Sequence, residues 1–528
     1  MIQIIKKLIN KNSRFIRYCI GGGFAFLVDL SLLYILTEYV RLWYLYSATL
    51  SFVVTAMVNY TIQKYWTFKN SERKIGQQFL SFLIIQVIGL LLNNLTLYIF
   101  VEFVGLWYML AKILAAGLVL IWNYWAGKKF VFKADAVDIV LAGEIFPPEI
   151  GGPATYTYRL AEYFLAHHIN FVVLYYSYLK NKKNNGDLEK FLIRINGWLP
   201  IPIKYFIYFL RLFSRSIHAK VIYAQGPVAS GWPALMVSKL LGKKLVVKVV
   251  GDYAWEQARL AHVTVSGIDD WQKKADMCSK NYFFKQKIKT LNNIERLVVR
   301  HATAVIVPSD YLKKIVLGWG ADESNVKVIY NSVALKNLGT LSKAEAQEKI
   351  KIFGDLIITV ARLLPWKGME MLIKIMPELL KLNPKFKLLI AGRGPEEDRL
   401  KKIVEALKIK DKVFFLGNLR QEDLAIHYLA SSIFLLNSGY EGLSHAILDA
   451  MYYNLPIIVS DIGGNPELIQ DDYNGLLVEY NNASEWIKAI EKIWGNERLR
   501  LRLSANPLSK LDVFSFDSMM RETLKILN

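Results

Sequence analysis

Residues 59–68 read NYTIQKYWTF and residues 123–132 read NYWAGKKFVF, so asparagine, tyrosine, lysine and phenylalanine recur at the same offsets. The same shift places the LWY at residues 42–44 on the LWY at residues 106–108. Matches of this kind without a gap indicate an internal duplication. We therefore predict that the first part of the chain contains two copies of one helical hairpin.

Four apolar stretches run through this duplicated region, at residues 18–36, 44–58, 79–100 and 108–122. A helix needs about 20 residues to cross the bilayer core, and the second and fourth stretches reach that length only with their flanks. The chain of 528 residues is 53% hydrophobic, and the apolar excess lies before residue 127. We predict a four-helix transmembrane bundle over residues 1–133.

Basic residues predict the orientation of this bundle. They precede the first stretch, separate the second from the third and follow the fourth, whereas the two other loops carry Arg41 alone. The positive-inside rule then places both termini and the remainder of the chain on the cytoplasmic side of the cell membrane. The net charge of +21 suits an anionic membrane surface, and no nucleic-acid motif accompanies it, so we expect no nucleic-acid partner. The oligomeric state stays open.

Polar residues within the apolar stretches are candidates for handling a lipid head group. Asp29 lies in mid-stretch and matches Asn93 in the second copy, and a carboxylate at that depth is costly unless it is partnered or hydrated. The alternative for both residues is an interhelical hydrogen bond that holds the bundle together. Lys64 and Lys128, at the predicted cytoplasmic ends, would either meet lipid phosphates or extend to the interface as topology signals.

The repeated Asn-Tyr-x-x-x-Lys…Phe signature resembles that of the GtrA family of small four-span membrane proteins, over about residues 12–133. This resemblance implies a connection with polyprenyl-phosphate-linked sugars. It allows two roles for the bundle, as a translocation partner or as an anchor for a glycosyltransferase.

From residue 137 onward, short apolar runs alternate with helical patterns, which predicts buried parallel strands joined by helices. The predicted strands form two series, at residues 137–142, 171–176, 221–224, 245–250 and 304–307, and at residues 356–360, 386–391, 413–416, 433–436 and 457–459. We predict two doubly wound α/β domains over residues 137–335 and 336–528, with the site between them. A last helix near residues 516–527 is expected to cross back onto the first domain.

Two motifs follow predicted strands at the end where such folds bind ligands. Gly151 and Gly152 precede a helix, so the backbone there can approach an anionic ligand. Arg362 and Lys367 follow the first strand of the second series, and together they can grip a diphosphate through a bidentate contact and a point charge. Either motif alone would also fit a tight turn or a solvated surface pair.

A third motif reads SGYEGLS at residues 438–444 and precedes a helix. Glu441 lies in its loop, and Asp449 follows about two helical turns later on one face. The backbone N–H groups of Leu443 and Ser444 are expected to point at a phosphate. Standing alone, either carboxylate would be interpreted as a helix cap or a surface acid.

In combination these motifs resemble the retaining GT-B glycosyltransferases of the GT4-like family, over about residues 138–510. The elements occur in family order: Gly151-Gly152, Pro308-Ser309, Asn331, Arg362 with Lys367, Gly392-x-Gly394-Pro395, Glu441 with Asp449, and Gly463-Gly464 with Glu467. The resemblance implies that Arg362 and Lys367 neutralise the donor diphosphate and that Glu441 binds donor-sugar hydroxyls. It also implies that Asp449 holds the ribose and that Gly151 and Gly152 let the first domain close over the phosphates.

Two positions depart from the family pattern. Asp449 stands where a glutamate is usual, and its carboxylate reaches about one methylene less far. The family often has a histidine after the strand that ends near residue 250, where this chain reads GDYAWE at residues 251–256. We expect Asp252 to take over the contact with the donor sugar, the alternative being a degenerate enzyme.

The expected function is that of a membrane-tethered, retaining glycosyltransferase. It would move a sugar from a nucleotide diphosphate sugar to a lipid-linked acceptor. No Asp-x-Asp motif and no His/Cys ligand cluster occurs in the sequence, so we expect neither a metal nor a cofactor. The alternative function is a translocator of polyprenyl-phosphate-linked sugar that the soluble region feeds or regulates. The basic, aromatic segment 199–218 would lie in the membrane interface or cover the core of its own domain.

Overall fold

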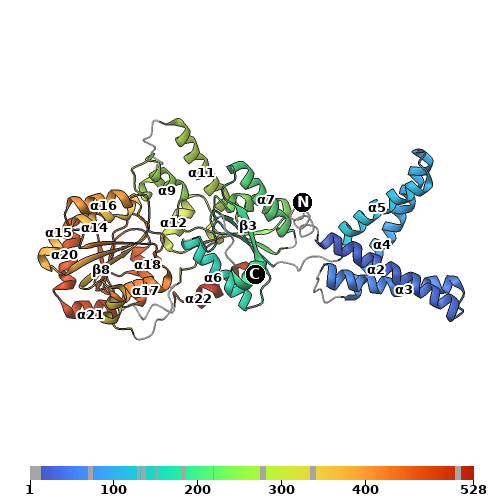
Figure 1. Ribbon diagram of the computed structural model, residues 1–528. Coiled ribbons are helices and arrows are strands. Elements are labelled where there is room, and N and C mark those ends of the chain that lie inside the picture. The colour runs from blue at the N-terminus through green and yellow to red at the C-terminus, as the bar shows by residue number, and fades with distance from the viewer. Residues whose placement is uncertain are drawn as a thin grey trace. The chain divides into compact units, whose positions relative to one another are not determined.

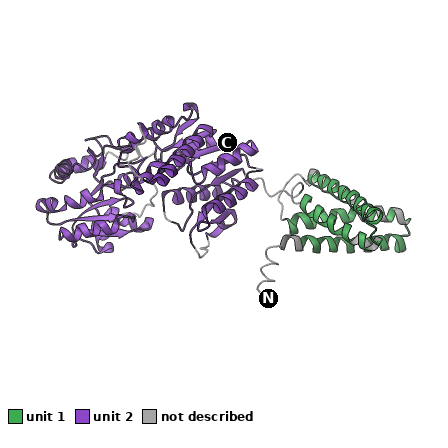
Figure 2. Ribbon diagram, turned by 90° about the horizontal axis from the view of Figure 1, so that it is seen from above, with its two compact units in different colours: residues 1–136 green, residues 137–528 purple. Residues whose placement is uncertain are grey.

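The computed structural model describes residues 13–68, 75–127, 131, 138–149, 151–179, 185–217, 219–273, 281–332, 341–505 and 513–528. It divides into two compact units, residues 1–136 and residues 137–528 (Figure 2). The first unit is helical, and the second contains two parallel sheets with helices around them (Figure 1).

The first unit contains two helical hairpins. Its helices are α2 (Ser13–Tyr34), α3 (Tyr44–Ile62), α4 (Ile75–Tyr98) and α5 (Tyr108–Ala126). π-helical turns extend the first three, at η1 (Ile35–Tyr39), η2 (Gln63–Thr67) and η3 (Ile99–Phe103). Helix α2 packs along α3, and α4 packs along α5 (Figure 1).

The two hairpins repeat each other in backbone conformation. Helices α3 and α5 each follow a tryptophan with nearly identical dihedral angles, −56° and 132° at Trp43 and −56° and 129° at Trp107. The preceding turn contains one left-handed residue in each copy, Arg41 with φ 59° and Gly105 with φ 70°. Glycine adopts this conformation freely, whereas arginine does so at a cost. The duplication in sequence is therefore a duplication of structure.

Two helical segments of the described part of this unit are long and apolar enough to cross a membrane, Arg17–Tyr39 and Gln78–Phe103. A shorter apolar helix covers Leu114–Ala126. Two of the four predicted spans therefore meet the criterion of length and composition. The other two, and the orientation of the bundle, stay predictions.

The first domain of the second unit is built on a seven-stranded parallel sheet with the order β3-β2-β1-β4-β5-β6-β7. Its strands are β1 (Ile139–Ala142), β2 (Phe171–Ser177), β3 (Leu192–Asn196), β4 (Val221–Ala224), β5 (Lys244–Lys248), β6 (Ala304–Val307) and β7 (Val326–Val328). Its helical elements are α6 (Gly152–Ala166), η5 (Gly186–Phe191), α7 (Ile201–Ser216), α8 (Gly231–Leu241), α9 (Tyr253–Leu260), α10 (Ile268–Lys273), α11 (Tyr282–His301), α12 (Asp310–Gly318) and η6 (Glu323–Asn325).

The second domain is built on a six-stranded parallel sheet with the order β10-β9-β8-β11-β12-β13. Its strands are β8 (Asp355–Val360), β9 (Phe386–Ala391), β10 (Val413–Gly417), β11 (Ile433–Leu436), β12 (Ile457–Ser460) and β13 (Leu476–Val478). Its helical elements are α13 (Lys343–Ile350), η7 (Pro365–Lys367), α14 (Met369–Lys374), α15 (Met376–Leu382), α16 (Glu397–Ala406), α17 (Gln421–Ala430), α18 (His445–Tyr452), α19 (Asn465–Leu468), α20 (Ala483–Trp494) and α21 (Glu497–Ala505).

The last helix, α22 (Phe516–Leu527), packs on the first domain although it follows the second in sequence (Figure 1). Its Met519 and Met520 share an apolar cluster with Phe164 of α6 and Ile139 of β1. The end of the chain thus ties the two domains together.

Every predicted strand has its counterpart in one of the two parallel sheets, which agrees with the predicted pair of doubly wound domains. Three strands were not predicted, β3, β7 and β13, and each lies at the edge of its sheet. Two of them, β7 and β13, are three residues long, and β3 contains Arg194 and is mostly half-buried. Edge strands need less apolar sequence than central ones, so they give a weaker signal.

Candidate functional site

Lys367 and Glu441 form an ion pair at the carboxyl ends of two neighbouring strands. The Lys367 Nζ atom lies 2.5 Å from Glu441 Oε1, and the exposed fractions of the two side chains are 11% and 14%. Lys367 also donates to the carbonyl oxygen of Tyr440 (3.1 Å). Strands β8 and β11 are paired in parallel, so the loops that follow them share one edge of the sheet. The structure therefore brings together two of the residues predicted to act on the donor.

Two glycines from a third loop hold the backbone of Glu441. The N–H of Gly464 donates to the carbonyl oxygen of Glu441 (2.9 Å). A Cβ atom at Gly464 would collide with the carbonyl oxygen of Gly442, and Gly463 has a φ of 63°. Both positions need glycine, because the two loops approach each other more closely than a side chain permits.

Arg362, the second predicted diphosphate ligand, reaches the first domain. One of its terminal nitrogens lies 3.2 Å from Glu256 Oε2, with exposed side-chain fractions of 66% for Arg362 and 21% for Glu256. Beside this contact, the Trp255 ring packs against Trp366 and Tyr440, with centroid separations of 5.1 and 5.2 Å. Both predicted phosphate-binding cations are thus paired with carboxylates that an anionic ligand would have to replace.

Replacing Arg362 with alanine should raise the KM for the nucleotide sugar by about 10- to 100-fold, because a charge-assisted contact with phosphate is worth about 1.5–3 kcal/mol. The measurement is steady-state kinetics of the detergent-solubilised full chain. Arg420→Ala is the matched control, since Arg420 is exposed and pairs with Asp423 alone among its described ion-pair partners. Equal KM values for the two variants would remove Arg362 from the donor site.

Two further motif residues connect the domains. Asn331 donates to the carbonyl oxygen of Leu443 (3.3 Å) and accepts from Lys248 (3.4 Å). Burial lowers the pKa of Lys248 to about 7. Glu467 accepts from the backbone N–H groups of Asp310 and Tyr311 (2.9 and 2.7 Å), at the start of α12. These residues of the family pattern therefore hold the second domain against the first.

The remaining predicted donor ligands surround the starts of helices. Gly151 precedes α6 and Gly152 is its first residue, while the Ser444 hydroxyl caps α18 by accepting from the N–H of Ile447 (3.4 Å). Asp449, on α18, is 6% exposed, and its charge acts on the guanidinium of Arg159 in α6. Their contacts with a donor stay predictions.

Asp252, predicted to contact the donor sugar, caps helix α9. It accepts from the N–H of Trp255 (2.7 Å) and from the side chain of Gln272 (2.6 Å). Glu295 accepts from the N–H groups of Tyr253 and Ala254 at the same helix start (2.8 and 3.3 Å). Burial raises the pKa of Asp252 to about 6. Both carboxylate oxygens of Asp252 are engaged within the first domain, and its role toward the donor stays a prediction.

In the helical unit, Asp29 accepts from the Thr55 hydroxyl (3.3 Å), a contact that joins α2 to α3. Asn93 donates to its neighbour Asn94 (3.2 Å). Lys64 is 2% exposed, and its Nζ lies 5.8 and 5.6 Å from the ring centroids of Tyr60 and Tyr65. Lys128 and the basic residues within 1–12 and 69–74 lie outside the described residues. The hydrogen bond between Asp29 and Thr55 joins two helices, as the alternative role of Asp29 in holding the bundle together requires.

Helix α7 covers the sheet with one face and leaves apolar side chains on another. Tyr208, Leu212 and Ser216 are buried, whereas Ile201 and Phe206 are 66% and 61% exposed. This arrangement supplies the core-covering role proposed for the segment 199–218. Its exposed apolar side chains also keep the interfacial role open.

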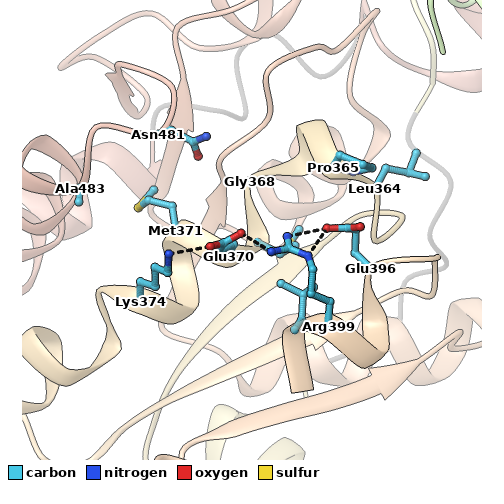
Figure 3. A pocket seen from close by; sticks show the side chains of 12 residues that line it. Leu364, Pro365, Gly368, Glu370, Met371, Lys374, Glu396, Arg399, Asn481 and Ala483 are labelled. Carbon is cyan, nitrogen blue, oxygen red and sulfur yellow. Dashed lines mark hydrogen bonds and ion pairs between the residues drawn. The ribbon is translucent and has the colours of Figure 1, made fainter. Parts of the chain in front are cut away.

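A pocket of about 400 Å³ opens next to η7 in the second domain (Figure 3). Glu370 pairs there with both Lys374 and Arg399 (2.6 Å each), and Arg399 also pairs with Glu396 (2.5 Å). None of the predicted donor ligands lines this pocket. Its charged groups pair with one another, and neither Lys367 nor Glu441 lines it.

Sequence reasoning missed Glu144, which follows β1 by two residues and is partly exposed. Burial raises its pKa to about 7, and the neighbouring charge of Glu256 adds to this effect. The available signal was its place directly after a predicted strand, at the ligand-binding end of the sheet.

Three family models match the chain in succession. Residues 17–132 match the family described as "GtrA/DPMS, transmembrane domain". Residues 150–337 match "Glycosyltransferase Family 4", and residues 342–507 match "Glycosyl transferases group 1".

Individual proteins agree with these matches. An uncharacterized glycosyltransferase of Haemophilus influenzae is 31% identical over 198 residues, which cover 37% of this chain and 55% of that protein. The N-acetylgalactosamine-N,N'-diacetylbacillosaminyl-diphospho-undecaprenol 4-alpha-N-acetylgalactosaminyltransferase of Campylobacter jejuni is 25% identical over 247 residues, 45% of this chain and 65% of that one. The chain thus spans less than two thirds of the length of these curated relatives.

Among solved structures, Anabaena HepE in complex with UDP superimposes with a TM-score of 0.57 at 17% identity, covering 74% of this chain and 99% of that one. At this identity the likeness concerns the fold alone. The order of the sheets, the motif residues that meet between them and the family matches agree with one another. The chain joins a GtrA/DPMS-type transmembrane domain to a glycosyltransferase region of the group 1 and family 4 type.

Proposed function

We propose that this protein is a membrane-anchored glycosyltransferase that moves a sugar from a nucleotide diphosphate sugar to a lipid-linked acceptor. Transfer would retain the anomeric configuration, need no metal ion and occur at the cytoplasmic face. The observation that carries the proposal is the Lys367–Glu441 ion pair beside Arg362, at the strand ends where parallel α/β folds bind ligands.

The chemistry follows from the charges in this group. In the reaction, a hydroxyl oxygen of the acceptor forms a bond to the anomeric carbon while the bond between that carbon and the diphosphate oxygen breaks. The electron pair of the broken bond leaves with the diphosphate, which takes up the proton of the acceptor hydroxyl. Arg362 and Lys367 would stabilise the charge that develops on this leaving group, the task a metal performs in other enzymes. Once the diphosphate engages Lys367, the carboxylate of Glu441 becomes available to accept hydrogen bonds from the donor sugar.

The helical unit supports a lipid-linked acceptor. The matched GtrA/DPMS-type domain and two apolar helices of spanning length attach the enzyme to a membrane. The name of the Campylobacter relative describes transfer to a sugar on diphospho-undecaprenol, which makes a polyprenyl carrier a reasonable expectation here. The hydrogen bond between Asp29 and Thr55 joins α2 to α3, a contact that a bundle acting as an anchor would use.

The test is a panel of nucleotide sugars offered to the purified full chain in detergent, with release of the nucleotide measured with and without polyprenyl diphosphate-linked sugars. One donor should give release that rises when the lipid-linked sugar is added, and chelation of divalent metals should leave the rate unchanged. Absence of release from every donor would contradict the proposal. Loss of activity on chelation would contradict only its metal-independent part.

A further inference from the structure

Glu144 stands at the centre of a group of carboxylates and tyrosines in the first domain. It follows β1, next to the loop after β4, where its Cδ atom would lie 3.2 Å from a Cβ atom at Gly226. The glycine therefore leaves room for the Glu144 side chain. The residue as a whole is half-buried, and burial of its carboxyl group raises the pKa of Glu144 to about 7.

Tyrosines from three elements surround this carboxyl group. The N–H of Tyr176 in β2 donates to the carbonyl oxygen of Glu144 (3.0 Å), and the Tyr208 hydroxyl of α7 donates to that of Gly143 (3.0 Å). The Tyr205 ring of α7 lies 6.2 Å from the Tyr176 ring, and the charge of Glu144 also acts on Tyr205 and on Tyr253 of α9. Tyr176 and Tyr208 are buried, whereas Tyr205 is half-buried and Tyr253 is 43% exposed. Two hydroxyphenyl groups beside a carboxylate thus remain accessible to a ligand, with both apolar ring surface and hydrogen-bonding groups.

A second carboxylate, Glu256 of α9, completes the group. Strands β1, β4 and β5 are parallel neighbours, so Glu144 after β1 and Glu256 after β5 lie at the same edge of the sheet, and the charge of Glu256 contributes to the raised pKa of Glu144. Two cations of the described part of this region have other partners. The Lys204 Nζ atom lies over the rings of Tyr176 and Tyr178, 5.7 Å from each centroid, and Arg362 pairs with Glu256. A negatively charged ligand would meet two carboxylates here, whereas hydroxyl groups could donate to both.

This group adjoins the donor residues. Glu256 pairs with Arg362, and a Cβ atom at Gly251 would lie 3.6 Å from Glu256 Oε1 and 3.0 Å from the hydroxyl of Tyr440. Tyr440 immediately precedes Glu441. A ligand held by Glu144 and Glu256 would therefore lie next to the place proposed for the donor sugar.

We propose that Glu144 and Glu256, with Tyr205 and Tyr253, form the acceptor site and bind an uncharged sugar through its hydroxyl groups. The acceptor is then a sugar already attached to the lipid carrier, not the phosphate of the carrier itself. In this assignment the enzyme extends a lipid-linked glycan and does not start one. The inference rests on the proposed function and names the chemical class of its acceptor.

The test compares Glu144→Gln with the wild type, using the full chain and two acceptor probes, polyprenyl diphosphate-linked monosaccharides and polyprenyl phosphate. The wild type should glycosylate the first probe and not the second. The variant should raise the KM for the sugar acceptor at least 10-fold, while the donor KM and the release of nucleotide without acceptor stay unchanged. Glu405→Gln, at an exposed carboxylate of α16, is the matched control and should change neither KM.

The pH profile separates a binding role from a structural one. The pKa of Glu144 lies near 7, so the fraction of the accepting carboxylate form rises through neutral pH. The wild-type kcat/KM for the acceptor should rise over the same range, and this rise should be absent in Glu144→Gln. The variant should fold normally, because it removes a carboxyl group whose ionised form burial disfavours.

Each outcome bears on one of the two proposals. Glycosylation of polyprenyl phosphate at a comparable rate, or an unchanged acceptor KM in Glu144→Gln with normal nucleotide release, would overturn the acceptor assignment alone. Absence of nucleotide release from the wild type with every donor would overturn the proposed function and the acceptor assignment with it.

Discussion

Replacing Glu441 with alanine should lower the rate of sugar transfer by about 1,000-fold, equivalent to about 4 kcal/mol of transition-state stabilisation. Two physical effects add in this variant. The proposed acceptor of donor-sugar hydrogen bonds is lost, and Lys367 loses its partner in a site where both side chains are largely buried. Removing one member of such a pair costs more than the pair itself contributes, because the remaining charge is left unneutralised.

The loss should be catalytic and not a failure to fold. The backbone of residue 441 is held through the N–H of Gly464 and by the close approach of Gly463, neither of which depends on the side chain. Glu441→Ala should therefore still fold and insert into the membrane, although the unpaired Lys367 should lower its unfolding temperature. The matched control is Glu378→Ala, which removes the exposed ion pair between Glu378 and Lys381 and should leave transfer unchanged.

Lys367→Ala and the double variant Lys367→Ala/Glu441→Ala complete a double-mutant cycle with Glu441→Ala. If the two side chains act as one unit, the double variant should be no slower than the slower single variant. Full activity of Glu441→Ala would remove Glu441 from the site. If the rate of the double variant instead falls by the product of the two single reductions, the two side chains act independently and the ion pair is incidental to the reaction.

The sequence was sufficient for the fold wherever strands are buried on both faces. Runs such as residues 386–391 are apolar at nearly every position, and all but one of them form central strands; the exception is the run at 413–416, which forms the edge strand β10. The edge strands β3, β7 and β13 were missed because a short or partly polar edge strand needs no continuous apolar run. The left-handed conformation of Arg41 was not predicted, because an arginine gives no local signal for it; the glycine at the repeated position, Gly105, adopts the same conformation.

For the site, sequence spacing identified residues that follow strands but not their partners. Arg362, Lys367 and Glu441 were predicted as donor ligands, yet the pairing of Arg362 with Glu256 joins residues of different domains. Asp252 was chosen for its position after β5. Its role as a helix cap depends on Gln272, which lies on another element and which no local pattern indicates. Glu144 was missed for the same reason. The residues that lie near it, Glu256 and the tyrosines, come from other segments of the chain.

Gly392→Ala should destabilise the second domain by about 3 kcal/mol or more and weaken donor binding as well. Gly392 follows β9 with a φ of 136°, a conformation that residues with a Cβ atom rarely adopt. A Cβ atom there would collide with the carbonyl oxygen of Ala361 and lie 2.9 Å from its carbonyl carbon. Because Arg362 follows Ala361 directly, the strain would be transmitted to a predicted diphosphate ligand.

Two measurements check this expectation on the full chain in detergent, the thermal unfolding temperature and the KM for the nucleotide sugar. Gly318→Ala is the matched control. A Cβ atom at Gly318, the last residue of α12, meets no atom within 4 Å, so that variant should unfold at the wild-type temperature or slightly above it. An unfolding temperature for Gly392→Ala equal to that of Gly318→Ala would mean that the loop after β8 yields to the new side chain. A lower unfolding temperature with an unchanged KM would mean that Arg362 keeps its position while the strand end is strained. The two measurements together therefore separate the stability of this loop from its part in binding the donor.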